Sequence, residues 1–220
     1  MRVEGELKRL VIGELLATNI NIGITKNNFN EILMCGKSDR LVIVTDAIYV
    51  LQKWCDGYEN DRKFSDVDVE LISDISINDH GSKIAVGVLG RGVIIYNYDS
   101  DNDYWDRCVD YINPPDIKTS DLFGYSLQYG PNDELYISAP NKQVNEFLNS
   151  GKIYICKESK KVMSGEDDND LIDYTLEDCT IVTLNSSEWG NNRLGFKITR
   201  NCELVTAQGM TTTVVLAVNT

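Results

Sequence analysis

Residues 120–140 read SDLFGYSLQYGPNDELYISAP, and residues 151–156 read GKIYIC. In this part of the chain, short apolar bursts alternate with clusters of Gly, Pro, Asn and Asp. Bursts rich in Val, Ile, Leu and Tyr between such turn residues are typical of antiparallel β-strands. Similar bursts recur along most of the chain, and nowhere does a helical period of 3.6 residues persist over a dozen residues. The sequence therefore predicts an all-β protein.

The bursts fall into sets of four predicted strands. The first set consists of Phe29–Leu33, Arg40–Val44, Ala47–Leu51 and Val67–Leu71. The second consists of Asp74–Ile77, Lys83–Val88, Gly92–Tyr96 and Tyr104–Tyr111. The third consists of Phe123–Tyr129, Glu134–Ala139, Gly151–Cys156 and Cys179–Leu184. The fourth set has only Leu194–Ile198, Cys202–Thr206 and Thr213–Val218. Four-stranded units that recur every 40–60 residues or so are typical of a β-propeller.

A small β-propeller of four blades, each with four antiparallel strands, is the predicted fold. The blades span residues 27–72, 73–112, 121–185, and 192–220 together with 6–16, in a single domain over 1–220. The apolar N-terminal segment Leu7–Leu16 belongs to no set, so we expect it to supply the missing fourth strand. Closure of the ring in this way protects strand edges that would otherwise be exposed.

Three motifs follow one another within residues 120–156: the pair Phe123-Gly124, the tripeptide Ser138-Ala139-Pro140 and the strand Gly151–Ile155. In this order they resemble one FG-GAP repeat of the integrin-α-type β-propeller family. Asn191–Phe196 is similar to the start of a second repeat, with Leu194 in the Phe position. The first two sets keep only parts of the motif, so the repeats are degenerate.

Both motif glycines have an expected structural role. Gly124 and Gly195 would allow close approach of backbones, and we expect Phe123 to pack between blades. Many members of the family bind Ca²⁺ through a D-x-D-x-D-G turn, but none of the four corresponding turns here has three alternating carboxylates. The family's calcium site is therefore not expected in this chain.

Composition excludes several classes of protein. With 34 Asp+Glu against 21 Lys+Arg, the 220-residue chain carries a net charge of −13, which repels nucleic acid, so no direct nucleic-acid partner is expected. The apolar runs are too short to cross a membrane, so no membrane insertion is expected either. No signal peptide is visible, which favours the cytoplasm or a virion over secretion.

The six cysteines show no CxxC spacing, and one His cannot complete a Cys/His zinc site. We therefore expect reduced and mostly buried thiols at Cys35, Cys55, Cys108, Cys156, Cys179 and Cys202.

Several residues are candidate site residues, and for each of them we favour a structural explanation. Asp99–Asp103 has alternating carboxylates but lacks the closing Gly and Glu of a calcium loop, so a solvated turn is expected. Glu166–Asp170 is interpreted as a solvated acidic loop. His80 is expected in a surface turn beside Gly81, and Trp105 is expected to be packed rather than to bind sugar. The other two tryptophans, Trp54 and Trp189, fall near the ends of sets.

A non-enzymatic protein–protein interaction or structural assembly module is thus the predicted function. The degenerate repeats and the abundance of Asn, Ile, Asp and Tyr are compatible with a viral genome, and we interpret the acidic protein as a virion or phage structural component with protein partners in a larger assembly. The alternatives are a carbohydrate-binding or cell-surface adhesion propeller and a glycan-cleaving enzyme. No catalytic, cofactor-binding or metal-binding residue is predicted, and no cofactor.

Deletion of residues 1–16 tests the closure of the ring. If Leu7–Ile12 pairs with Thr213–Val218, the deletion opens an apolar edge and destabilises the whole domain rather than one end of it. Thermal melting followed by circular dichroism should then show a lower midpoint for the entire transition. A cooperative transition at an unchanged temperature would contradict closure by the N-terminal segment.

Overall fold

The computed structural model describes residues 33–37, 39–54, 57–107, 111–146, 148–156, 160–163, 171–174, 180–182, 197–198 and 204–205. These residues form an all-β structure of three four-stranded and two two-stranded antiparallel sheets, with short 3₁₀ turns. The described part of the chain has no helix that is long and apolar enough to cross a membrane. The chain divides into two compact units, Met1–Leu71 and Ile72–Thr220.

The described residues of the first unit form a sheet with its strands in chain order. They are β1 (Leu33–Lys37), β2 (Arg40–Val44), β3 (Ile48–Trp54) and β4 (Gly57–Phe64). β4 is an edge strand that exposes Glu59, Asp61, Arg62 and Lys63 to solvent. Charged side chains on an edge strand hinder pairing with other chains.

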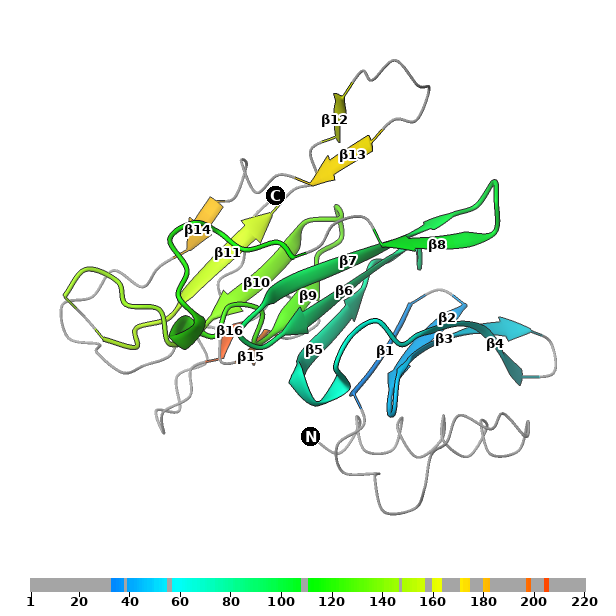
Figure 1. The fold of residues 1–220 in the computed structure, drawn as a ribbon, viewed down its shortest axis with the longest axis horizontal. Coiled ribbons are helices and arrows are strands. Elements are labelled where there is room, and N and C mark those ends of the chain that lie inside the picture. Colours follow the sequence, from blue (N-terminus) through cyan, green and yellow to red (C-terminus); the bar gives the residue numbers. More distant parts are fainter. Residues whose placement is uncertain are drawn as a thin grey trace. The chain divides into compact units, whose positions relative to one another are not determined.

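In the second unit, a sheet in chain order follows the 3₁₀ turn η2 (Val69–Leu71). Its strands are β5 (Ile72–Ile77), β6 (Lys83–Val88), β7 (Gly92–Asp99) and β8 (Tyr104–Arg107). We call it sheet B. Figure 1 shows it beside the next sheet along the chain.

That next sheet, sheet C, has the order β14-β11-β10-β9. The 3₁₀ turn η3 (Thr119–Asp121) precedes β9 (Leu127–Tyr129), β10 (Leu135–Ala139), β11 (Lys152–Cys156) and β14 (Thr180–Val182). A hairpin of β12 (Lys160–Met163) and β13 (Leu171–Tyr174) lies between β11 and β14 in the sequence. The last hairpin is β15 (Lys197–Ile198) with β16 (Leu204–Val205).

The all-β prediction is confirmed, and each of the three four-stranded sheets falls within one predicted set, apart from details at the ends. Several strands differ from the prediction. The first strand, β1 (Leu33–Lys37), shares only Leu33 with the predicted Phe29–Leu33. The fourth strand of the first set is β4 (Gly57–Phe64), whereas the predicted Val67–Leu71 includes the turn η2. The strands β12 and β13 were not predicted. β4 was missed because its exposed charges leave no apolar burst. Leu7–Ile12 and Thr213–Val218 lie outside the described residues, so closure of the ring stays a prediction.

The cysteine prediction is wrong for Cys156, which is disulfide-bonded. Composition and chain length indicated only that the domain does not need a disulfide, and they do not report whether two thiols meet in the fold. The side chains of the other cysteines lie outside the described part.

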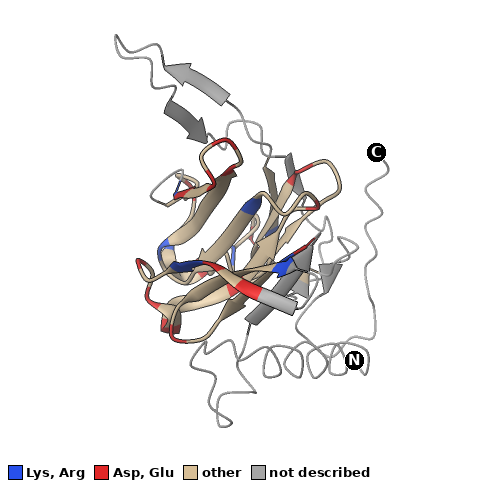
Figure 2. Ribbon diagram, turned by 90° about the vertical axis from the view of Figure 1, so that its right-hand side faces the viewer, with Lys and Arg blue, Asp and Glu red and all other residues tan. Residues whose placement is uncertain are grey.

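The middle strands of all three large sheets are buried along successive residues. Leu41–Val44, Ile84–Val88 and Leu135–Ala139 contain no exposed side chain. Because neighbouring residues on a strand point to opposite faces, each of these sheets is covered on both faces, unlike an antiparallel sheet with one solvated face. Figure 2 shows the Asp and Glu residues mostly at turns and strand ends of the ribbon, with few charged residues on the middle strands.

Sheets B and C share one apolar core. It combines Ala85, Val93 and Ile95 of sheet B with Leu127, Ile137, Tyr154 and others of sheet C. Phe123 belongs to this core, is 3% exposed and meets the Tyr154 ring edge-on at 5.3 Å between centroids. The prediction that Phe123 packs between neighbouring sheets is therefore confirmed.

Gly124 also has its predicted role. Its φ of +85° lies in the left-handed region, and a Cβ built on Gly87 of β6 would meet the Gly124 carbonyl oxygen at 2.0 Å. The close approach of the two backbones therefore requires glycine at position 87, whereas position 124 favours glycine because of its φ.

Phe123→Ala should lower the free energy of unfolding by about 3–5 kcal/mol, the range for aromatic truncation in a core. Chemical denaturation measures the change, and Tyr104→Ala is the matched control, because the Tyr104 side chain is 46% exposed and its loss should cost little. A stable Phe123→Ala protein that has lost a binding partner would instead make Phe123 a contact residue.

Candidate functional site

Residues 111–123, which we call the connecting loop, join sheet B to sheet C. Ile112 pairs with Val93 of β7 through two backbone hydrogen bonds of 2.8 and 3.0 Å. A turn at Pro114–Ile117 and η3 follow, each closed by a backbone hydrogen bond. Six residues of the connecting loop are exposed to solvent: Asn113, Pro115, Asp116, Lys118, Thr119 and Ser120.

Two lysines of sheet C and its β10–β11 connection hold the connecting loop. The Lys142 ammonium lies 3.2 Å from an Asp121 carboxylate oxygen and 3.4 Å from one of Asp116, and it also donates to the Asp116 carbonyl. Lys152 lies 3.1 Å from the Asp116 carboxylate. Both lysine side chains are largely buried, at 13% and 12% exposure. We call Asp116, Asp121, Lys142, Lys152 and Tyr154 the anchor.

Hydrogen bonds complete the anchor. The Tyr154 hydroxyl donates to both carboxylate oxygens of Asp116 at 3.3 Å, and the Lys152 ammonium lies 4.6 Å from the Tyr154 ring centre. The Lys118 backbone N–H donates to the Asp121 carboxylate at 2.9 Å. Two cations and two carboxylates thus compensate one another, as partly buried charges require.

The charges of the anchor shift two pKa values. Burial alone would raise the pKa of Asp116, but the hydrogen bond and charge of Lys152, with the charge of Lys142, outweigh it and hold the pKa below its usual range. Burial, and after it the neighbouring carboxylate of Asp116, raises the pKa of Tyr154 far above its ordinary value. At neutral pH, Tyr154 therefore remains a hydrogen-bond donor and Asp116 an anion.

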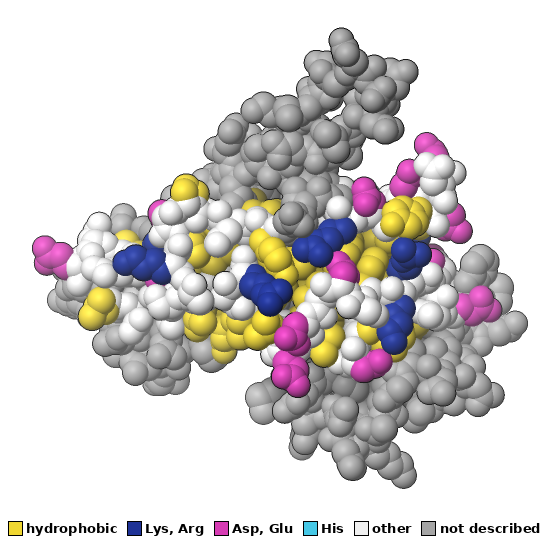
Figure 3. Space-filling view, viewed as in Figure 1, with side chains coloured by type: hydrophobic (Ala, Val, Ile, Leu, Met, Phe, Trp, Pro, Cys, Tyr) yellow, Lys and Arg dark blue, Asp and Glu magenta, His cyan; other side chains and the backbone are white. Residues whose placement is uncertain are grey.

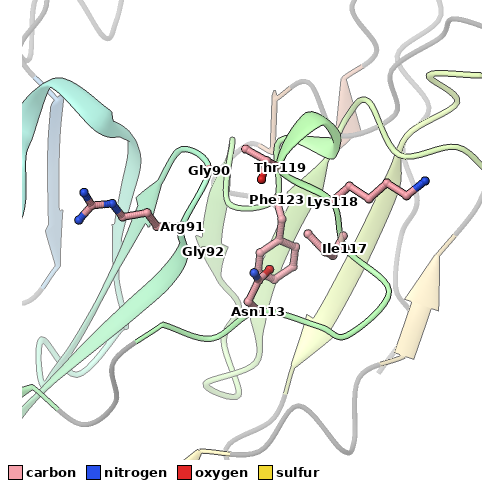
Figure 4. Close-up of a pocket in the computed structure, with 8 residues that line it drawn as sticks. All are labelled: Gly90, Arg91, Gly92, Asn113, Ile117, Lys118, Thr119 and Phe123. Carbon is pink, nitrogen blue, oxygen red and sulfur yellow. The ribbon is translucent and has the colours of Figure 1, made fainter.

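A small hollow lies where the connecting loop meets the β6–β7 turn. Its volume is about 60 Å³, and it is lined by Gly90, Arg91, Gly92, Asn113, Ile117, Lys118, Thr119 and Phe123. Figure 4 shows the Asn113 side chain next to the Phe123 ring, while the Arg91 and Lys118 side chains extend away from the group in opposite directions. The two cations therefore do not converge on a ligand in the hollow.

Polar side chains also join β5, β9 and β15, along a line that we call the seam. Buried Asp74 accepts hydrogen bonds from the Ser126 hydroxyl at 2.8 Å and from the Leu127 N–H at 3.0 Å. Ser76 accepts from the Tyr129 N–H at 2.9 Å. In the same way, Ser126 accepts from the Ile198 N–H at 3.1 Å. Sheet B thus satisfies backbone donors of sheet C, and Ser126, just before β9, satisfies one of the β15–β16 hairpin.

The residues that the sequence singled out do not meet in one place. His80 is exposed in the β5–β6 turn, as predicted, and Trp105 is buried against Tyr98 at 5.3 Å between ring centres. Asp99–Asp103 forms the β7–β8 turn. The Asp99 carboxylate accepts a hydrogen bond from the Asn102 side chain, and the Asp103 carboxylate accepts one from the Tyr98 hydroxyl. Glu166–Asp170, Trp189 and the side chain of Trp54 lie outside the described residues.

Within the described part of the chain, no group of three or more His, Cys, Asp or Glu side chains is placed to hold a metal ion. The hydrogen bonds of Asp99 instead stay within its own turn, and that from the Asn102 side chain contributes most to lowering the Asp99 pKa.

Sequence reasoning missed the anchor and the seam. Asp116 is 26 and 36 residues away from the two lysines that it contacts, so no local motif contains them. The one local signal was the alternation of Lys152 and Tyr154 on β11, which places both side chains on the same face of the sheet.

No protein-family model matches the chain, and no curated protein matches it. The site is therefore interpreted from its own geometry.

Acid should weaken the anchor. The pKa of Asp116 is lowered in the folded state, so its contribution to stability is full above the unfolded value near 4 and is lost as the pH falls through the folded value. Urea denaturation should show that the wild type has a higher free energy of unfolding than Asp116→Asn at pH 6. This difference should shrink below about pH 4. Because the Asp116 side chain is 48% exposed, we expect added salt to reduce the gap.

The control for this measurement is Lys152→Gln. In that background Asp116→Asn should have a smaller effect, because the main cation has gone. An equal effect of Asp116→Asn with and without Lys152 would contradict the ion pair as the cause.

Proposed function

We propose that the protein is a non-enzymatic interaction and assembly module, built as a small four-bladed propeller related to FG-GAP repeat proteins. The connecting loop, together with the β6–β7 turn, is its docking surface for a protein partner in a larger assembly such as a virion or phage particle. The observation that carries the proposal is the anchor, which holds an exposed loop in one shape at the cost of burying two lysines.

The seam supports the propeller. Asp74 of β5 contacts Leu127 of β9, and further along the same strands Ser76 contacts Tyr129, so β5 and β9 run in the same direction. Ser126 accepts a hydrogen bond from the backbone N–H of Ile198 in β15, in the same way as Asp74 accepts one from the backbone N–H of Leu127. First strands of successive units that lie side by side and parallel are what a radial arrangement of blades requires.

Burial on both faces of the large sheets supports it as well. In a propeller each blade packs between two neighbours, whereas a two-layer sandwich leaves one face of each sheet in water. Within the second unit, the successive buried residues of β6 and β10 favour the radial arrangement.

Surface features favour a protein partner over a small substrate. The hollow beside the loop holds about 60 Å³, against roughly 300–1,000 Å³ for typical small-molecule sites, and none of its lining residues is Asp or Glu. Rigid scaffolds that present exposed loops are a common basis for binding. Figure 3 shows one face of the protein, on which Lys and Arg side chains are spread among apolar atoms despite the net negative charge.

Photo-crosslinking in the native assembly tests the docking surface. A photoreactive amino acid replaces Lys118, which is exposed on the connecting loop, and in a matched protein it replaces His80, which is exposed in the β5–β6 turn at the other end of sheet B. Position 118 should crosslink to one defined protein, and position 80 should give much less of that product. Equal crosslinking from both positions, or none from either, would contradict the proposal.

Calcium distinguishes the adhesion alternative. A ligand that binds only the native state stabilises it by about 2.7 kcal/mol when its concentration is a hundred times its Kd. A calcium-binding protein should therefore melt at a higher temperature in millimolar Ca²⁺. Our proposal instead expects the melting temperature to stay nearly unchanged. An upward shift that Asp101→Ala abolishes would favour a calcium-dependent, carbohydrate-binding adhesion propeller.

A further inference from the structure

The two ends of the second unit differ in charge. β5 and β9 are parallel along the seam, and β5, β6 and β7 are successive antiparallel strands, so β5, β7 and β9 all run in the same direction. The turns that follow these three strands therefore lie at one end of the unit. Among the described residues of these turns, Lys83 at the start of β6 is the single Lys or Arg, against six carboxylates: Asp79, Asp99, Asp101, Asp103, Asp133 and Glu134.

The opposite end of the unit has a small excess of cations. It contains the β6–β7 turn, the connecting loop and the β10–β11 connection up to the first residue of β11. Within the described part of these segments there are four cations and three carboxylates: Arg91, Lys118, Lys142 and Lys152 against Asp116, Asp121 and Glu146. In a chain with a net charge of −13, this end therefore differs in sign from the rest.

The anchor decides which charges of the docking surface face outward. Both carboxylates of the connecting loop are engaged within it: the two buried lysines and the Tyr154 hydroxyl contact Asp116, and Lys142 and a backbone N–H contact Asp121. Arg91 and Lys118 are both exposed and line the hollow. Their side chains extend away from the hollow in opposite directions (Figure 4).

We propose that the docking surface binds an extended acidic segment of another protein, with carboxylates that reach Arg91 on one side of the hollow and Lys118 on the other. This inference rests on the proposed function and names the chemistry of its partner. Two cations that point in opposite directions favour an extended chain over a single compact anion. A guanidinium binds a carboxylate through two parallel hydrogen bonds, and an ammonium binds it as a point charge.

The net charge of the chain disfavours two other anionic partners. Nucleic acid carries a phosphate charge at every nucleotide, so the field of the whole protein repels it more strongly than it repels a segment with a few carboxylates. A second copy of this chain could offer its own acidic turns, but it would also bring a further net charge of −13. A separate protein with a local acidic segment avoids most of that repulsion.

Photo-crosslinking from Thr119 in the native assembly identifies the segment. Thr119 is exposed and lines the hollow, so a photoreactive amino acid at this position leaves both cations in place. Mass spectrometry of the crosslinked peptide should show a segment of another protein with Asp or Glu on both sides of the crosslinked residue, within about five residues, since an extended chain spans about 3.3 Å per residue.

The outcomes separate this inference from the proposed function. A crosslinked protein segment without flanking Asp or Glu overturns the acidic partner and leaves the docking surface standing. A peptide from a second copy of this chain, or a nucleotide adduct, also overturns the inference. Failure to crosslink from both Lys118 and Thr119 overturns the proposed function, and the inference with it.

Charge variants supply the second measurement. In the protein with the photoreactive group at position 119, Arg91→Gln combined with Lys118→Gln should lower the yield of the crosslinked product roughly three- to tenfold. Raising NaCl from about 50 mM to about 500 mM should lower the yield in the protein that keeps both cations, with much less effect on the double variant, because salt screens exposed charges.

The matched control is Lys53→Gln combined with Arg62→Gln, which removes the same charge from exposed positions of the first unit. This control should leave the yield nearly unchanged. Equal losses in the two double variants would show an effect of net charge alone and would overturn the inference. Thermal melting checks that each variant folds, and the sequence of the crosslinked peptide tests the inference even if one of them does not.

Discussion

The hydrogen bonds that Asp74 accepts from Ser126 and Leu127 are the contact on which the second unit depends. In sheets B and C, which are antiparallel, the first strand along the chain, β5 or β9, is an edge strand without a backbone partner on one side. Backbone donors on a buried edge must find acceptors, or each costs about 1–3 kcal/mol. Short polar side chains on β5 meet that need for β9, and Ser126 does the same for β15. Neighbouring sheets are thereby set side by side in a defined register.

Glycine makes this contact sterically feasible. Beside the seam, the Gly124 carbonyl lies against Gly87, where no side chain fits. Phe123, one residue earlier, turns its ring into the core between the sheets. The pair that resembles an FG motif therefore combines two adjacent functions, an aromatic wedge and a backbone contact, and both are structural.

The anchor shows how the scaffold presents a surface. Loops usually vary in conformation because few contacts hold them, but the connecting loop ends in a β-bridge at Ile112 and in a core residue at Phe123, and the anchor fixes it between these points. The exposed polar residues of the loop are consequently displayed by a rigid base. A preorganised surface of this kind loses less entropy on binding, which is why we assign the proposed partner to it.

The sequence by itself determined the strand content, most strand positions and the burial of Phe123, because these follow from short-range patterns of apolar and turn residues. It misplaced β4, since a charged edge strand has no apolar pattern, and it missed the disulfide state of Cys156. Only the tertiary structure decided the seam and the anchor. Asp74 and Ser126 are 52 residues apart, and Asp116 and Lys152 are 36 apart, so each contact depends on how whole sheets pack, and no local spacing encodes it.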